Sequence, residues 1–355
     1  MQLTLDAPEL TPPPAAFPNL HDHDAIVICS SGGQDSTAMT AYLAEQITTQ
    51  NYTDPVVVIH NDLGTTDTGE PIEWAGAEQL AREHAAAYGF RFEVLRREKG
   101  GLWQQLLTER HLWMGERARW CTADQKTSQG MKFVTRLTTE LRDQLGITGR
   151  PVRVLYCLGL RAEESAGRRK QPPLAVDTAH SSGARTVTRW LPIHAWTLDQ
   201  VWEQIRKAGL RTHDAYTRGM ARLSCRLCIL ASVDDLMLSG ALNPAVLADY
   251  RRAERELGHR FTATLSITQI TAALTAARLA LTNPDLAAVQ EGTLYHLTRE
   301  IVDEQNELRT GTYVRTGKPR RWTAQQVDER TRARVAQLMV SARRAIRLAT
   351  SPLVQ

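Results

Sequence analysis

A short glycine loop between an apolar run and a helix-like run constrains the fold of this chain most. Residues 25–29 are apolar and predict a buried strand, the loop Ser31–Ser36 contains two glycines and two serines, and residues 37–50 predict a helix. In this order of elements the loop N–H groups converge, and the helix N-terminus adds partial positive charge. Glycines let the backbone approach an anion closely, and serines supply hydroxyl donors. The sequence therefore predicts a phosphate site that lacks the Gly-Lys-Ser/Thr of a Walker loop.

Strand-like and helix-like runs alternate through the first two-thirds of the chain. Further strands are predicted at residues 55–60, 92–95 and 152–157, and helices at 72–88, 102–112, 123–145 and 198–207. Apolar strands separated by helices predict an α/β fold with a doubly wound, mostly parallel sheet. Ligands of such sheets bind at the carboxyl ends of the strands, so Ser31, Asp62 and Arg161 are expected to share one crevice.

Composition divides the chain into three predicted parts. Residues 1–23 form an extended, proline-containing lead-in, and residues 24–240 form a nucleotide-binding domain with a cysteine loop at 221–230. Residues 241–355, rich in Ala, Leu and Arg, are expected to form a helical C-terminal subdomain. The polar stretch 168–189 predicts a mobile loop over the crevice.

The bulk properties set limits on partners and location. A hydrophobic fraction of 42% predicts a well-packed globular protein, and no apolar run reaches the length of a membrane span. No basic-then-apolar leader is present, so a cytoplasmic location is expected. The net charge of +4 permits a nucleic-acid partner without requiring one. Five cysteines in a cytosolic chain of this length serve as core residues, metal ligands or redox groups rather than as a disulfide scaffold.

Charged residues mark two further candidate regions beside the loop. Asp35 is suited either to orient Mg²⁺, which needs few carboxylates, or to stabilise the helix N-terminus by charge. Arg119 and Lys126 flank Cys121, where they either favour its thiolate or hold the phosphates of a nucleotide. Cys121 is otherwise an inert buried thiol.

Several roles are consistent with the pair Cys225 and Cys228. A Cys-x-x-Cys motif serves as half of a zinc site, as a redox pair or as part of an iron–sulfur site, and two packing cysteines are the remaining alternative. With Cys121 the count becomes three thiolates, enough for a [4Fe-4S] cluster with one iron open to another ligand. His213 and His259 are candidate fourth ligands or ordinary histidines.

Arginines follow the strand at 152–157, and a basic group lies near the C-terminus. Residues 159–165 with Arg168 and Arg169 suit phosphate recognition or start a solvated helix. Residues 315–322 contain four cations and Trp322. This composition is typical either of a surface that binds a nucleic-acid backbone or of a solvated basic loop.

These motifs together resemble the phosphoadenosine phosphosulfate (PAPS) reductase-like family of PP-loop ATP pyrophosphatases. The resemblance spans residues 24–262 and implies an adenine-nucleotide α-hydrolase-like fold acting on ATP or an adenylyl sulfate. The segments that carry it are 31–36, 119–126, 159–165, 190–202, 216–228 and 243–259.

The cysteine pattern separates the branches of that family. Its sulfonucleotide reductases carry a nucleophilic cysteine in a Glu-Cys-Gly tail motif, and this chain has no cysteine after Cys228. One cysteine after Arg-Trp and a later Cys-x-x-Cys are more similar to the sulfurtransferase-type enzymes of DNA phosphorothioation systems, which carry an iron–sulfur cluster. Gln34 stands where the family often has lysine, which removes one cation from the phosphates.

The resemblance implies roles for particular residues. Catalytic roles fall on Asp35, Cys121, Lys126 and Arg161, and cluster ligation on Cys121, Cys225 and Cys228. Contacts to ATP and Mg²⁺ fall on Ser31, Gly32, Gly33, Gln34, Asp35, Ser36, Asp62 and Arg119. The implied enzyme releases pyrophosphate while activating an acceptor for sulfur transfer.

The expected partners and the alternative functions follow from the same resemblance. A sulfur-donor protein, a nucleic acid bound by the basic C-terminal region, and a homo-oligomer or larger complex are the partners to expect. A sulfonucleotide reductase and a non-catalytic nucleotide- or nucleic-acid-binding subunit are the alternatives.

Overall fold

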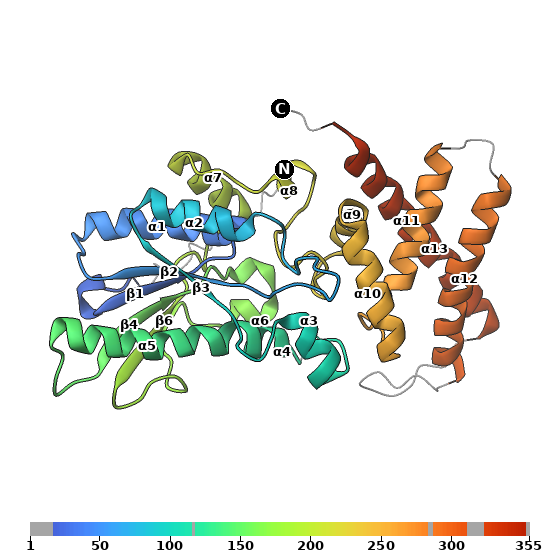
Figure 1. Cartoon of the computed structure of the whole chain (residues 1–355). Coiled ribbons are helices and arrows are strands. Elements are labelled where there is room, and N and C mark those ends of the chain that lie inside the picture. The colour runs from blue at the N-terminus through green and yellow to red at the C-terminus, as the bar shows by residue number, and fades with distance from the viewer. Residues whose placement is uncertain (1–16, 116–117, 283–286, 311–322, 353–355) are drawn as a thin grey trace, which may run out of the picture. The chain divides into compact units, whose positions relative to one another are not determined.

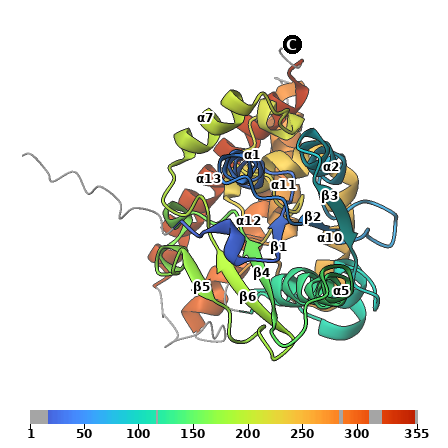
Figure 2. The ribbon, with the colours of Figure 1, turned by 90° about the vertical axis from the view of Figure 1, so that its left-hand side faces the viewer.

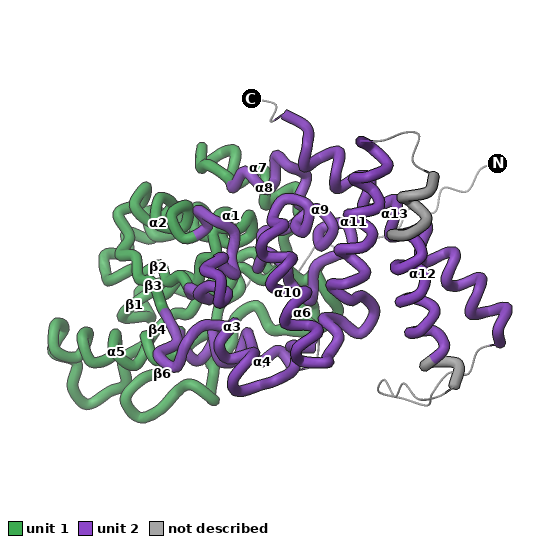
Figure 3. Tube along the Cα trace, turned by 45° about the vertical axis from the view of Figure 1, so that its right-hand side comes forward, with its two compact units in different colours: residues 1–60, 78–95, 130–212 green, residues 61–77, 96–129, 213–355 purple. Residues whose placement is uncertain are grey.

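The computed structural model describes residues 17–115, 118–282, 287–310 and 323–352. The chain divides into two compact units, each assembled from separate stretches (Figure 3). The first contains residues 1–60, 78–95 and 130–212, and the second contains residues 61–77, 96–129 and 213–355. The boundaries at residues 23 and 240 stay a prediction.

A six-stranded sheet forms the centre of the first unit. β1 pairs in parallel with β2 and β4, β4 pairs in parallel with β6, and β5 runs antiparallel to β6. The order across the sheet is β3-β2-β1-β4-β6-β5. The strands are β1 (Ala25–Cys29), β2 (Val56–Asn61), β3 (Arg91–Leu95), β4 (Val152–Cys157), β5 (Leu174–Val176) and β6 (Arg185–Trp190). The predicted α/β fold with a mostly parallel sheet is confirmed.

Helices cover both faces of this sheet because the side chains on both faces of the central strands are apolar. α1 (Gln34–Thr49), α2 (Ala77–Ala87) and α7 (Leu198–Ala208) lie on one side, and α5 (Ser128–Leu145) lies on the other (Figures 1 and 2). Ile26 and Ile28 of β1 pack in the core under α1, whereas Val27 packs in the core under α5. Burial on both faces explains why the strands read as continuous apolar runs.

The predicted elements and the observed ones differ at two places. The stretch 168–189 is not a loop throughout, because it contains β5 and most of β6. Only Val187 of its β6 residues is fully buried, so these strands near the sheet edge lack the apolar run that marked the central strands. The helix expected over 72–88 begins at Ala77, since residues before it form isolated bridges.

Short helices are distributed over both units. They are η1 (Leu20–Asp22), α3 (Leu102–Gln105), η2 (Leu106–Arg110), α4 (Trp120–Thr122), η3 (Ala123–Thr127), η4 (Ala162–Glu164), α6 (Ala166–Arg169) and α8 (Asp214–Thr217). α4, η3 and α5 follow one another without a break.

The second unit ends in a group of longer helices. They are α9 (Val233–Leu242), α10 (Pro244–Leu257), α11 (Ile267–Thr282), α12 (Ala287–Thr310) and α13 (Ala324–Thr350). α11 contacts each of the other four. α10 starts with proline at its first turn and stops at Gly258, whose φ of 57° is left-handed. Among the described helices, none is both long and apolar enough to cross a membrane.

The buried carboxylate of Asp24 gives a stability prediction. Burial alone would raise the pKa of Asp24, but hydrogen bonds from Arg150 and from the backbone and side chain of Arg153 lower it to about 2. Because this pKa lies below the value in the unfolded chain, the interactions of the Asp24 carboxylate stabilise the fold above about pH 4. Their contribution to the free energy of unfolding is lost as the pH falls toward 2. We expect Asp24→Asn to lower the free energy of unfolding by about 2 kcal/mol at pH 7.

Urea unfolding at pH 7 and pH 3 measures this effect. The exposed neighbour Asp22 provides the control substitution Asp22→Asn, for which we expect no change. An equal loss in Asp24→Asn at both pH values would contradict the electrostatic explanation.

Candidate functional site

The loop between β1 and α1 is folded around its own hydroxyl groups. The backbone N–H of Ser31 donates to Ser36 Oγ at 3.2 Å, and Ser36 Oγ donates to the carbonyl of Gly33 at 2.9 Å. Gly32 has a φ of 71°, a conformation that a residue with a Cβ rarely adopts. The loop predicted from the sequence therefore exists as a defined turn between strand and helix.

The N-terminus of α1 has no side-chain cap. Gly33 occupies the N-cap position, and no side chain caps the helix there. The first-turn amides have no partner within the helix, and the helix dipole adds partial positive charge at this end. Gln34, where the family often has lysine, is buried in this turn.

His60 supports the loop from the neighbouring strand. Its ring is fully buried on β2, and its Nδ1 donates to the carbonyl of Ser30 at 3.0 Å. This bond holds the backbone where β1 ends and the loop begins. Sequence reasoning missed this residue, although a histidine at the end of an apolar strand run was a usable signal.

Arg161 is joined to the loop through Asp35. Its Nε donates to Asp35 Oδ1 at 2.6 Å, and its Nη1 lies 3.2 Å from Glu163 Oε2. The Arg161 side chain is 6% exposed, so two carboxylates neutralise a buried cation. The structure thus brings together Asp35 and Arg161, with Arg161 already paired.

Gly159 makes the closest approach to the loop from β4. A Cβ built on Gly159 would lie 3.1 Å from the carbonyl oxygen of Asp35 and 3.3 Å from the backbone nitrogen of Ser36. The segment after β4 therefore packs against the first turn of α1 with no room for a side chain. Together with Arg161, this contact sets the position of α1 relative to β4.

Two predicted nucleotide ligands belong to the second unit. Asp62 accepts hydrogen bonds from the Gly64 N–H at 2.8 Å and from Arg96 at 2.5 Å. Arg119 is exposed at the start of α4. Their shared crevice with Ser31 stays a prediction, and residues 315–322 lie outside the described residues.

The second unit gathers the three candidate cysteines around Lys126. Cys121 lies on α4, Lys126 on the adjoining η3, and Cys225 and Cys228 on the loop before α9. Cys225 forms a backbone bridge with Glu73, a residue that sequence reasoning missed. Burial alone would lower the pKa of Lys126, but Cys225 and Glu73, then Cys228 and Cys121, raise it above its ordinary value. All three thiols therefore lie within electrostatic range of one ammonium group.

At Cys121, burial and the nearby ammonium group of Lys126 have opposite effects. Burial raises the pKa of the Cys121 thiol and outweighs the opposing effects of Thr122 and Lys126. Burial likewise raises the pKa of Cys225, although Lys126 opposes it. The roles predicted for Arg119 and Lys126 beside Cys121 stay predictions.

The candidate metal ligands are the three cysteines and two histidines. Three partly buried cysteines supply the thiols that iron–sulfur clusters use. Within the described ranges, no three His, Cys, Asp or Glu are placed to hold one metal ion. The ring of His213 is engaged, because it accepts from the Ala215 N–H and bonds the Ala75 carbonyl. His259 Nδ1 accepts from the Trp113 N–H at 3.3 Å.

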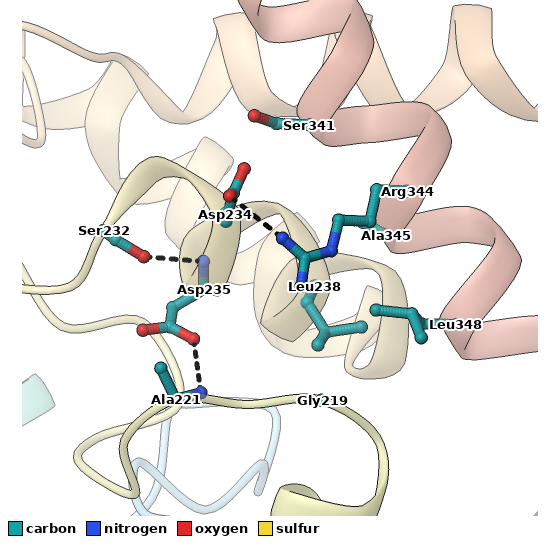
Figure 4. Close-up of a pocket in the computed structure, with 10 residues that line it drawn as sticks. All are labelled: Gly219, Ala221, Ser232, Asp234, Asp235, Leu238, Ser341, Arg344, Ala345 and Leu348. Carbon is teal, nitrogen blue, oxygen red and sulfur yellow. Dashed lines mark hydrogen bonds and ion pairs between the residues drawn. The ribbon is translucent and has the colours of Figure 1, made fainter. Parts of the chain in front are cut away.

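A cavity of about 130 Å³ lies beside the cysteine loop, between α9 and α13 (Figure 4). Asp235 accepts from the N–H of Ala221 at 2.9 Å, and Asp234 forms an ion pair with Arg344 (Figure 4). Ser232 Oγ caps the same helix by accepting from the Asp235 N–H. Asp235 thus anchors the start of the cysteine loop to α9, and Asp234 joins α9 to α13.

The fold and the loop define a nucleotide-binding α/β protein, and the sequence comparison identifies its family. The model of the phosphoadenosine phosphosulfate reductase domain matches residues 25–231. The chain therefore belongs to this family, whose members are enzymes. No curated protein matches the chain.

Solved structures similar to this chain are distant. Phosphoadenylyl-sulfate reductase of Candida auris, in a phosphate complex, is 16% identical with a TM-score of 0.34 over 59% of this chain and 82% of that one. FMN adenylyltransferase of Candida glabrata, with FAD and inorganic pyrophosphate, is 12% identical with a TM-score of 0.37 over 57% and 55%. The U34-tRNA thiolase NcsA of Methanococcus maripaludis, with its [4Fe-4S] cluster, is 14% identical with a TM-score of 0.33 over 69% and 79%.

The tight contact at Gly159 predicts a destabilised loop in Gly159→Ala. The added Cβ would press on the backbone of Asp35 and Ser36, which cannot move without shifting α1. We expect the free energy of unfolding to fall by about 1–3 kcal/mol, as for other overpacked sites. Denaturant unfolding measures the change, with Gly183→Ala as the control because nothing lies within 4 Å of a Cβ there. Equal stability of the two variants would show that the contact is not tight.

Proposed function

We propose that this protein is an ATP pyrophosphatase that adenylylates an acceptor and so activates it for sulfur transfer. The observation that carries the proposal is the N-terminus of α1, which follows the glycine loop and has no side-chain cap. Such a site favours a polyphosphate, because several N–H donors and the helix dipole act on one anion. Membership in a family of nucleotide enzymes supports the same choice of ligand.

The proposed reaction is a displacement at the α-phosphorus of ATP. An oxygen of the acceptor forms a bond to this phosphorus, and the bond to the oxygen that bridges to the β-phosphorus breaks. Pyrophosphate leaves with that electron pair, and the acceptor carries the adenylyl group. The loop amides hold the leaving phosphates, so the protein contributes positioning and charge stabilisation.

Asp35 and Arg161 have distinct parts in this proposal. Mg²⁺, when bound, neutralises phosphate charge and needs only one or two protein carboxylates. Asp35 is the carboxylate at the loop and is held by Arg161 at 2.6 Å. Arg161 thereby orients Asp35 and the first turn of α1, and its own charge is balanced by Asp35 and Glu163.

The cysteines of the second unit supply the sulfur chemistry in this proposal. Cys121, Cys225 and Cys228 would hold an iron–sulfur cluster, whose open iron binds sulfur when the cluster is present. Lys126 balances the negative charge of the thiolates. A nucleic-acid acceptor is the proposed substrate class, which the net charge of +4 permits.

Pyrophosphate release is the direct test of this function. Purified protein with ATP, Mg²⁺ and candidate nucleic acids is expected to release pyrophosphate and to leave an equal amount of adenylyl group on the acceptor. Asp35→Asn should lower the rate at least 100-fold because the carboxylate at the loop is lost, while the exposed Asp22→Asn should match the wild type. Release of only ADP and phosphate would exclude the proposal, as would sulfite release from an adenylyl sulfate. Tight ATP binding without turnover would instead indicate a non-catalytic subunit.

Metal analysis tests the cysteine proposal separately. Anaerobically purified protein is expected to contain iron and to absorb visible light. Cys225→Ser should lose the iron, because one of three thiol ligands is removed. Cys157→Ala provides the control, since Cys157 is buried in the sheet of the first unit. Iron content unchanged in Cys225→Ser, or zinc in place of iron, would contradict a cluster on these residues.

A further inference from the structure

Arg189 lies near the carboxyl end of the sheet, outside every motif that the sequence assigned to the site. It precedes the last residue of β6 and is paired in register with Tyr156 of β4, which in turn is paired with Val27 of β1. Residues paired directly across strands project to the same face. Arg189 therefore projects toward α5, two strands from the strand that leads into the phosphate loop.

The guanidinium of Arg189 lacks a counter-ion in the described part of the chain. Its Nε is buried and has no hydrogen-bond partner there, and no ion pair reaches its side chain. Other arginines of the first unit are different. Arg161 binds Asp35, Arg168 binds Glu164, and Arg185, on the same face of β6, donates to the carbonyl of His180.

An unpaired, half-buried cation is costly for a folded protein. When a charged donor is buried without a partner, it loses its hydration, and no protein interaction compensates for this loss of free energy. Such a group persists where a ligand supplies the missing charge, and ligands of doubly wound sheets bind at the carboxyl ends of the strands. Arg189 stands at that end of the sheet.

We infer that Arg189 binds an oxyanion of a substrate, which acts as its counter-ion. A guanidinium recognises phosphate or sulfate through two parallel hydrogen bonds, so these are the ligand groups that fit. The anion comes either from the nucleotide or from a second, separate substrate. If the anion belongs to ATP, the inference rests on the proposed function. Binding of an oxyanion to Arg189 is nevertheless measurable without any turnover.

Binding measurements on Arg189→Ala test the inference. The probes are ATP, adenosine and inorganic sulfate, titrated by calorimetry into the full chain. If Arg189→Ala lowers the affinity for ATP at least tenfold and leaves the affinity for adenosine unchanged, Arg189 binds a phosphate group of the nucleotide. A similar loss for sulfate with ATP binding intact places it on a separate substrate. If the wild type releases no pyrophosphate, the proposed function fails while these titrations still decide the role of Arg189.

Thermal melting of the protein without added ligand separates binding from a structural role. Removing an unpaired cation should leave the melting temperature unchanged or raise it, whereas a structural arginine would lower it. Arg185→Ala is the matched control on the same face of β6, and it should leave both affinities unchanged. Arg189→Lys keeps the charge without the two-pronged geometry, and an affinity between those of wild type and Arg189→Ala is expected. Affinities of Arg189→Ala within twofold of the wild type for ATP and sulfate would overturn the inference, as would a lowered melting temperature with affinities intact.

Discussion

The contact between the segment after β4 and the first turn of α1 is the constraint on which the phosphate loop depends. Gly159 packs against the backbone of Asp35 and Ser36, and Arg161 binds the Asp35 carboxylate from the same segment. His60 secures the other side of the loop from β2. A loop rich in glycine is costly to order, so its shape depends on neighbouring strands that hold it in place.

Arg161 and Arg189 differ in whether their charge is available to a ligand. Arg161 is buried between Asp35 and Glu163, so its charge is already used within the protein. Arg189 lies one strand further along the sheet without a counter-ion in the described residues. Sequence spacing singled out Arg161 and not Arg189, since it cannot show which cation has a carboxylate beside it.

The cysteines of the second unit illustrate the competition between burial and charge. Lys126 attracts thiolates, yet burial keeps the pKa of Cys121 and Cys225 above the ordinary value. A cation nearby is therefore insufficient to activate these thiols, and a bound metal cluster is the kind of group that would stabilise them as thiolates.

The amino-acid sequence by itself determined the central strands, the phosphate loop and the family. β1 and β4 were predicted to the residue, because strands buried on both faces are marked by unbroken apolar runs. Strands β5 and β6, the Asp35–Arg161 pair and the isolated charge of Arg189 were decided only by the tertiary structure. They depend on which side chains meet across strands, and pairing between distant segments leaves no periodic signal in the chain.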